Sequence, residues 1–158
     1  MTATLTDAAS TGGGPPNALW MLNSLLVERA TATDTGGAFT LHEQWISAAG
    51  NPPPHVHADQ DEAFFVLEGQ IEVTVDGETS VVPAGGFAFG PRGVPHTYAV
   101  PEGTAHLLVI ATPGGIEDFF RELGEPAGAF ELPEPTAPDP QVVTSIAARH
   151  GITILPPS

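Results

Sequence analysis

Between residues 38 and 111 the chain is a series of short apolar runs, and a turn signal separates each run from the next. The runs have the length of strands, and several alternate apolar with polar residues, which puts one kind of side chain on each face. Turn signals such as Asp76-Gly77, typical of a tight hairpin, recur about every eight to twelve residues. This spacing leaves no room for long helices and predicts a mostly β domain, either a sandwich or a barrel.

The composition of the chain agrees with a fold rich in turns. Its 158 residues include 18 Gly and 17 Pro, more than average usage. A chain of this length is typical of one domain, and 41% hydrophobic content is typical of a soluble globular protein. We therefore expect a small, Gly/Pro-rich flexible arm over residues 1–17, a β-barrel over 18–112, and a helical appendage with a tail over 113–158.

The apolar runs predict where the strands lie. We expect strands within residues 18–30, 38–46, 55–57, 63–67, 71–75, 79–82, 87–89, 97–100 and 105–111. The first is predicted as one strand because its stretch from Leu19 to Val27 is apolar and has the length of a strand. In the second, His42 and Gln44 share one face and the large apolar side chains take the other.

The periodicity becomes helical after residue 112. Apolar residues within 116–123 recur at helical spacing, and Gly124 can end this helix. A second helix is predicted with Asp139 as its N-cap and Pro140 at its first position. Its apolar face is predicted to contain Val142, Val143, Ile146 and Ala147. Residues 152–155 predict an edge strand or an apolar strap.

Charge and composition exclude several classes of function. Nineteen acidic and four basic residues give a net charge of −15, which disfavours nucleic acid and anionic membrane surfaces as partners. There is no cysteine, so a metal would have to be held by histidine and carboxylate. The first residues do not resemble a secretory signal, and no stretch of about 18 apolar residues occurs, so we expect a cytoplasmic protein.

Four residues have the spacing of a metal site. His55 and His57 are two apart in an extended segment after three prolines, so they project to the same side. Glu62 follows after a short polar connection, and His96 comes from a separate hairpin stiffened by prolines. Three imidazoles and a carboxylate suit one divalent first-row transition metal (Fe, Mn, Co, Ni, Cu or Zn) and leave coordination positions open. Singly, each residue could instead be an ordinary surface group.

The same residues carry a resemblance to a known family. The stretch His55-x-His57-x4-Glu62-x6-Gly69 resembles the first cupin motif, and the stretch from Gly85 to His96 resembles the second. The resemblance implies a small jelly-roll β-barrel with one or two C-terminal helices, a homodimer, and His55, His57, Glu62 and His96 as metal ligands. Two positions depart from the pattern: Gly50 stands one residue too close to His55, and Val100 replaces a common asparagine.

A closer resemblance extends through residues 34–39, 61–69 and 119–126. The chain resembles bacterial single-domain cupins similar to quercetin 2,3-dioxygenase. This implies an oxidoreductase that uses O2 to cleave a flavonol-like or other enolic aromatic small molecule. In the implied mechanism the metal binds the deprotonated substrate hydroxyl, and the catalytic Glu62 stays a ligand or loosens to take the proton. A non-oxidative polyketide cyclase or isomerase, and a binding module without catalysis, remain alternatives.

Strand parity predicts the residues beside the metal. If Glu62 points inward, so do Phe64 and Val66, and if His96 points inward, so does Tyr98. These three neighbours would form a substrate-binding wall, or else simply the core of the barrel.

The remaining candidates carry weaker predictions. His42 could lie behind the metal ligands or face solvent, and His106 is expected to be a hydrogen-bonded core histidine. Arg92 is expected to stabilise its own turn rather than bind a substrate anion.

Overall fold

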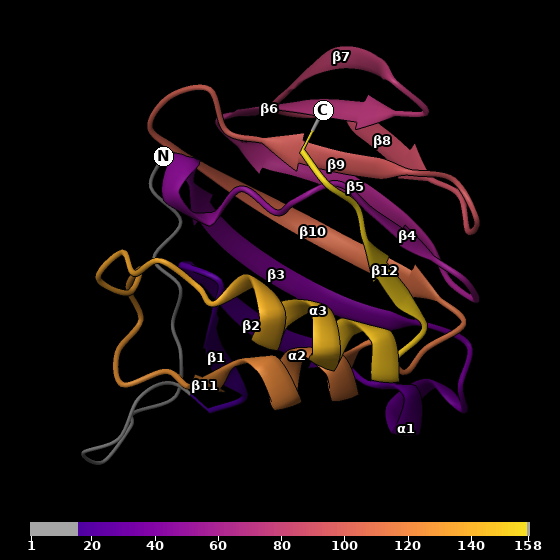
Figure 1. Ribbon diagram of the computed structural model, residues 1–158. Coiled ribbons are helices and arrows are strands. Elements are labelled where there is room, and N and C mark those ends of the chain that lie inside the picture. Colours follow the sequence, from indigo (N-terminus) through magenta and orange to yellow (C-terminus); the bar gives the residue numbers. More distant parts are fainter. Residues whose placement is uncertain (1–15, 158) are drawn as a thin grey trace.

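The fold is a sandwich of two antiparallel sheets with two helices packed at one end (Figure 1). A computed structural model describes residues 16–157. The prediction of a mostly β jelly roll with C-terminal helices is confirmed. Most of the arm predicted over residues 1–17 lies outside the described residues. None of the helices within 16–157 is long and apolar enough to span a membrane.

The larger sheet has seven strands, and every neighbouring pair is antiparallel. Its order is β11 (Glu125–Pro126), β1 (Ala18–Met21), β2 (Ser24–Ala30), β3 (Thr40–Ser47), β10 (Thr104–Thr112), β5 (Asp61–Glu68) and β8 (Phe87–Gly90). β8 is therefore an edge strand. The alternating burial of β3, β5 and β10 shows that one face of this sheet is turned to the core.

The smaller sheet has five strands and faces the first. Its order is β12 (Ile152–Ile154), β4 (His55–His57), β9 (His96–Ala99), β6 (Gln70–Val75) and β7 (Glu78–Pro83). The turn between β6 and β7 is at Asp76-Gly77, where both residues have positive φ, as predicted for a tight hairpin. β12 is an edge strand paired with β4. Of the two alternatives predicted for residues 152–155, the edge strand is therefore the correct one.

The prediction of a single strand over residues 18–30 is wrong. This segment is the hairpin β1–β2, and its turn is at Leu22 and Asn23, which have φ values of 47° and 62°. The turn lacks the usual glycine, so the apolar stretch concealed it. Asn23 holds the turn from outside, because its side-chain amide donates hydrogen bonds to the carbonyls of Ala49 (3.0 Å) and Thr136 (2.8 Å).

Four short helical segments complete the fold: α1 (Ala32–Thr35), the 3₁₀ turn η1 (Ala48–Gly50), α2 (Glu117–Leu123) and α3 (Pro140–Arg149). α3 begins as predicted, since the Asp139 carboxylate accepts a hydrogen bond from the Gln141 backbone N–H and Pro140 follows the cap. The predicted apolar face of α3 wrongly included Val142, which is 50% exposed, whereas Val143 and Ala147 are buried.

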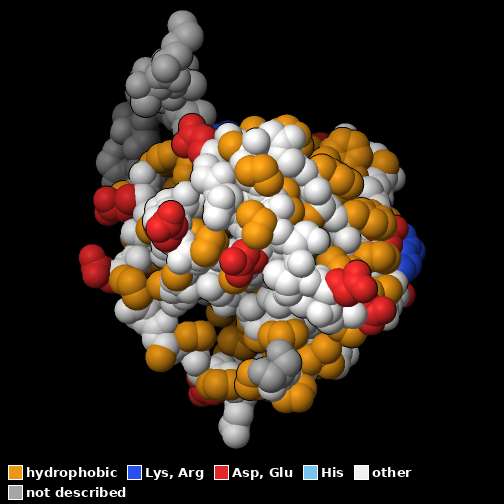
Figure 2. Space-filling model, turned by 90° about the horizontal axis from the view of Figure 1, so that it is seen from above, with side chains coloured by type: hydrophobic (Ala, Val, Ile, Leu, Met, Phe, Trp, Pro, Cys, Tyr) orange, Lys and Arg blue, Asp and Glu red, His pale blue; other side chains and the backbone are white. Residues whose placement is uncertain are grey.

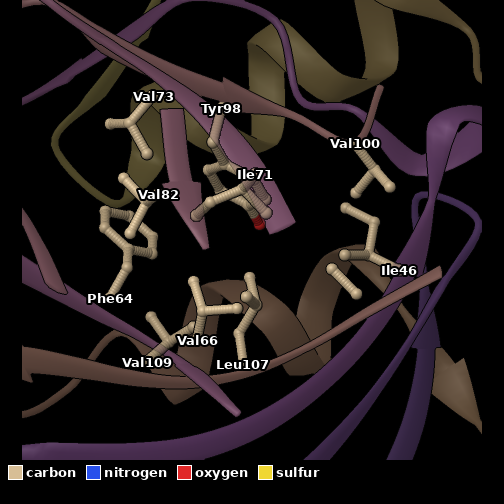
Figure 3. Packing of buried hydrophobic residues seen from close by; sticks show 11 residues of the cluster. Ile46, Phe64, Val66, Ile71, Val73, Val82, Tyr98, Val100, Leu107 and Val109 are labelled. Atoms are coloured by element: carbon tan, nitrogen blue, oxygen red, sulfur yellow. The ribbon is translucent and has the colours of Figure 1, made fainter. Parts of the chain in front are cut away.

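The core is divided between the two ends of the sandwich. At one end, side chains from both sheets point toward one another (Figure 3) and include Phe64, Val66 and Tyr98. At the other end, α2 and α3 pack Phe119, Phe120 and Ala147 against strand residues. The strand β12, from beyond the predicted barrel boundary at residue 112, pairs with β4. The division of the chain at residue 112 therefore stays a prediction.

Candidate metal centre

Four buried side chains, from His55, His57, Glu62 and His96, converge between the two sheets. Their ligand atoms all lie within 4.8 Å of one another. The Glu62 Oε2 atom is 2.9 Å from the Nε2 atoms of His57 and His96, and 3.7 Å from that of His55. The structure thus brings together every residue of the predicted ligand set.

Strand pairing explains the convergence. His55 and His57 are at the two ends of β4 and both are buried, while Val56 between them is not. β9 pairs with β4 so that His96 lies directly opposite His55. Glu62 comes from β5 in the facing sheet. The two sheets therefore contribute the imidazoles from one side and the carboxylate from the other.

Backbone carbonyls orient two of the imidazoles. His55 Nδ1 is 2.9 Å from the Pro53 carbonyl, and His96 Nδ1 is 3.2 Å from the Val94 carbonyl. A carbonyl only accepts, so each Nδ1 carries a proton and each Nε2 is the ring atom that faces Glu62. This is the arrangement that metal-binding histidines adopt.

His57 supplies a separate indication of a bound ion. It is 3% exposed, and neither of its ring nitrogens has a hydrogen-bond partner among the described residues. An unsatisfied buried nitrogen costs about 1–3 kcal/mol, so such groups require an explanation. A metal ion beside Nε2 removes that cost, and a set of three imidazoles and one carboxylate suits a divalent first-row metal.

Glu62 is held as a carboxylate. Burial by itself raises the pKa of this carboxyl, but attraction to the adjacent imidazoles, that of His57 foremost, outweighs burial and holds the pKa well below its usual range. The site therefore presents one fixed negative charge and three nitrogen donors, as a divalent cation requires.

Gly90 is a site residue that sequence reasoning missed. It lies opposite Glu62 in the pairing of β5 with β8. A Cβ atom at this position would come within 2.9 Å of three ring atoms of His96. Glycine is required here by close packing against a ligand, and its position next to the Pro91 of the second motif was the available signal.

Comparison with known protein families finds a match to the central part of the chain. The model of the cupin domain matches residues 44–111. This chain carries a cupin domain. An RmlC-like cupin from Shewanella frigidimarina NCIMB 400 has a similar structure, with a TM-score of 0.56 and 22% identity, covering 66% of this chain and 89% of that one.

Two curated relatives share part of the cupin sequence. Quercetin 2,3-dioxygenase of Bacillus subtilis (strain 168) is 33% identical over 81 residues, which are 51% of this chain and 24% of that protein. An uncharacterized protein of Aquifex aeolicus (strain VF5) is 38% identical over 60 residues, which are 38% of this chain and 50% of that protein. The chain therefore matches half or less of the length of each relative.

Three of the four candidate metal ligands, His55, His57 and Glu62, line a cavity of about 70 Å³. Phe64 and Tyr98 line this cavity, and their role in binding a substrate stays a prediction. Val66 also points inward, but it packs in the core and is absent from the cavity wall formed by the described residues. The reason is its position on β5. Val66 is two residues beyond Phe64, and so about 7 Å farther along the strand from Glu62.

Most of the cavity wall comes from outside the cupin motifs. It is lined by Met21, Leu22, Leu26, Gln44, Pro52, Pro53, His55, His57, Glu62, Phe64, Tyr98, Val109, Ile116, Phe119, Phe120, Val143, Ile152 and Ile154. The β1–β2 hairpin, α2, α3 and β12 thus close the site. Sequence reasoning assigned those segments to structure alone, because their apolar residues have no chemical signature.

Two polar side chains are fixed within this apolar wall. The Tyr98 hydroxyl donates a 2.8 Å hydrogen bond to Gln44 Oε1, and Gln44 Nε2 donates to Ser24 Oγ at 3.2 Å. Burial, with a smaller contribution from the charge on Glu62, raises the pKa of Tyr98, so its proton is retained. The Tyr98 oxygen and the second amide hydrogen of Gln44 stay free to bind a ligand.

His42 lies on the inner face of β3, so the solvent-facing alternative is wrong. It is fully buried, its ring meets Phe120 edge to face at 4.8 Å, and its two nitrogens have no hydrogen-bond partner within residues 16–157. Burial lowers the pKa of His42 to about 4, against the opposing charges of nearby carboxylates. His42 is therefore neutral at physiological pH.

The other two candidates stabilise structure. The backbone N–H and guanidinium of Arg92 donate to the carboxylate of Asp61, which supports the turn interpretation. His106 Nε2 is 2.8 Å from Glu43 Oε1, and the ring stacks on Trp45 at 4.1 Å. His106 has a hydrogen-bond partner as predicted, but the prediction that it lies in the core is wrong, because its side chain is on the outer face of the sheet while the neighbouring Ala105 and Leu107 face inward.

Proposed function

We propose that this cupin is a metal-dependent dioxygenase that acts on a neutral, enolic aromatic molecule of the flavonol type. The observation that carries the proposal is the convergence of His55, His57, Glu62 and His96 beside an apolar cavity. These four residues would hold the metal, which supplies Lewis-acid and redox chemistry when bound. Glu62, the catalytic residue of the proposal, accepts the proton of the substrate hydroxyl.

The wall of the cavity supports a neutral substrate. Apart from His55, His57 and Glu62, the three proposed ligands that line it, the described lining residues of the cavity are all uncharged, and no Lys or Arg is among them. A carboxylate or phosphate would lose its hydration there without gaining a cationic partner. Phe64 and Tyr98 provide flat apolar surface, and the Tyr98–Gln44 pair orients an oxygen of the substrate.

The similarity to quercetin 2,3-dioxygenase supports an oxidative reaction. That relative is named as a dioxygenase of quercetin, and it shares 33% identity over 81 residues with this chain. The proposal therefore includes a small-molecule substrate and O2 as co-substrate.

The proposal is tested by measuring O2 uptake. The protein is loaded separately with each candidate metal, its metal content is measured, and a flavonol is added. We expect O2 consumption and a ring-cleaved product with at least one metal. Absence of both with every metal would refute the dioxygenase, and turnover in strict anaerobiosis would indicate a non-oxidative cyclase or isomerase instead.

We also infer that the chain forms a homodimer through the outer face of the larger sheet. Phe65 on β5 and Phe87 and Phe89 on β8 are exposed by 38%, 63% and 46%. Phe65 lies directly opposite Phe87, and Ala63 opposite Phe89, so the aromatic rings share one face at a sheet edge. Two copies with a charge of −15 each can meet most easily at an uncharged apolar patch.

A further inference from the structure

The cavity beside the metal ligands is too small for the whole of a flavonol-like substrate. It measures about 70 Å³, whereas an engineered cavity that holds benzene measures about 150 Å³. Typical ligand sites occupy roughly 300–1,000 Å³. If the proposed function is correct, most of the substrate must therefore lie outside this cavity.

A larger groove adjoins the cavity. It measures about 510 Å³ and lies between α3, the β1–β2 turn, the segment before β4 and the residues that follow β12. The groove and the inner cavity have five lining residues in common: Leu22, Pro52, Pro53, Val143 and Ile154. Because the two spaces share these walls, the groove lies directly beside the cavity that holds the candidate metal ligands.

The chemistry of the groove is unusual for this protein. Acidic side chains are spread over the face seen in Figure 2, where a hollow is bordered by hydrophobic groups. The described residues that line the groove are all uncharged, although the chain has a charge of −15. Six of them are prolines: Pro52, Pro53, Pro138, Pro140, Pro156 and Pro157. Proline is rigid and has no backbone N–H, so the groove offers preformed apolar surface.

A second opening near the metal ligands has a different character. It measures about 210 Å³, shares His57 with the cavity, and includes Asp59, Gln60 and His150 in its lining. An ionised aspartate and an imidazole favour water over an aromatic ring. The apolar part of a substrate is therefore better accommodated in the proline-lined groove.

We propose that the proline-lined groove binds the distal aromatic ring of the substrate, whose oxygen-bearing head lies at the metal ligands. The inference rests on the proposed function for the position of the head. It also defines the substrate more closely: an elongated neutral molecule that carries a second ring in addition to the enolic head group.

The test measures binding separately from turnover. The zinc-loaded protein is titrated with 3-hydroxyflavone and with 3-hydroxychromone, which has the same head but lacks the distal phenyl ring. We expect 3-hydroxyflavone to bind about tenfold more tightly or better, the effect of burying one ring. Thr144, an exposed residue of α3, lines the groove, so Thr144→Trp should remove most of this advantage.

Ser145→Trp is the matched control. Ser145 is the next residue of α3 and is also exposed, but the groove is lined by Thr144 rather than by Ser145 among the described residues. It should leave both dissociation constants within about twofold. Equal binding of the two probes, equal effects of the two variants, or no binding of either probe would overturn the inference.

O2 uptake on the same proteins separates this inference from the proposed function. O2 consumption together with equal binding of the two probes would refute the groove and leave the dioxygenase intact. Selective binding of 3-hydroxyflavone without O2 consumption would refute the dioxygenase and support the groove.

Discussion

At the scale of single residues, the two ring nitrogens of His57 are the strongest evidence that the centre binds a metal. They are buried and have no hydrogen-bond partner among residues 16–157, although Nε2 lies 2.9 Å from Glu62. We predict that His57→Ala lowers metal affinity by more than about 100-fold, since loss of an outer-shell partner alone costs 10–100-fold. Metal content after dialysis against a competing chelator measures the change.

The control for this prediction is His106→Ala. His106 lies on the outer face of β10, hydrogen-bonded to Glu43 and stacked on Trp45, so the variant should keep its metal. Full metal content in the His57 variant, or equal losses in the two variants, would contradict the assignment of His57 as a ligand.

The buried side chain of His42 leads to a prediction about how the stability of the fold depends on pH. The pKa of His42 is about 4 in the folded protein and near the ordinary histidine value of 6.5 in the unfolded chain, so the unfolded state binds more protons between these pH values. Stability should therefore fall as pH decreases through this range, by about 2 kcal/mol at pH 5 relative to pH 7.5. His42→Leu should abolish this part of the loss.

Urea unfolding of the metal-free protein at the two pH values tests this prediction. All other groups are common to the two proteins, so the quantity of interest is the difference between wild type and variant in the pH-dependent change of the free energy of unfolding. The same pH-dependent loss in both would show that His42 is solvated or hydrogen-bonded in the folded state.

At the scale of elements, Glu117 attaches α2 to the larger sheet. This side chain is 4% exposed. Its carboxylate accepts hydrogen bonds from Thr40 Oγ1 (2.6 Å), Ala32 N–H (2.7 Å) and Gly115 N–H (3.0 Å). Because α2 supplies Phe119 to the cavity wall, the Glu117 contacts hold one side of the site in place.

We predict that Glu117→Ala lowers the free energy of unfolding by about 2–4 kcal/mol, since it leaves buried donors without an acceptor. The matched control is Asp118→Ala on the same turn of the helix, where the side chain is 71% exposed, with an expected change within about 0.5 kcal/mol. Denaturant unfolding measures both. A similar small change in the two variants would mean that water replaces the Glu117 contacts.

At this scale, the start of a helix or the position of a turn could be predicted only where residues at that position signal it. The Asp139-Pro140 start of α3 and the Asp76-Gly77 turn were found because each uses a residue type that the backbone requires. The turn at Leu22 and Asn23 was missed because its left-handed residues are held by contacts from Ala49 and Thr136, far along the chain.

At the scale of the whole molecule, the proposed dimer makes a prediction about assembly. Phe87→Lys places a charge in the apolar patch of Phe65, Phe87 and Phe89, where two copies would have to bury it, and should shift the protein toward monomer. Val81→Lys is the control, because Val81 is 59% exposed on β7 of the other sheet. Sedimentation velocity over a range of concentrations measures the assembly. A wild-type monomer would refute the proposal.

The sequence by itself determined the fold class and which residues converge on the centre. Both depend on local rules: a period of two sets the face on which each strand side chain lies, and proline and glycine set the turns. His55, His57, Glu62 and His96 could therefore be named from spacing, and the cupin resemblance agreed with them.

Only the tertiary structure decided what surrounds the centre. The hairpin β1–β2, α2, α3 and β12 close the cavity, and Gly90 makes room for His96, although their apolar residues look like ordinary core in sequence. Hydrophobic burial is non-directional, so an apolar residue specifies that it is buried but not against what. The cavity and the proline-lined groove arise where elements distant in the chain meet, and no local pattern records that meeting.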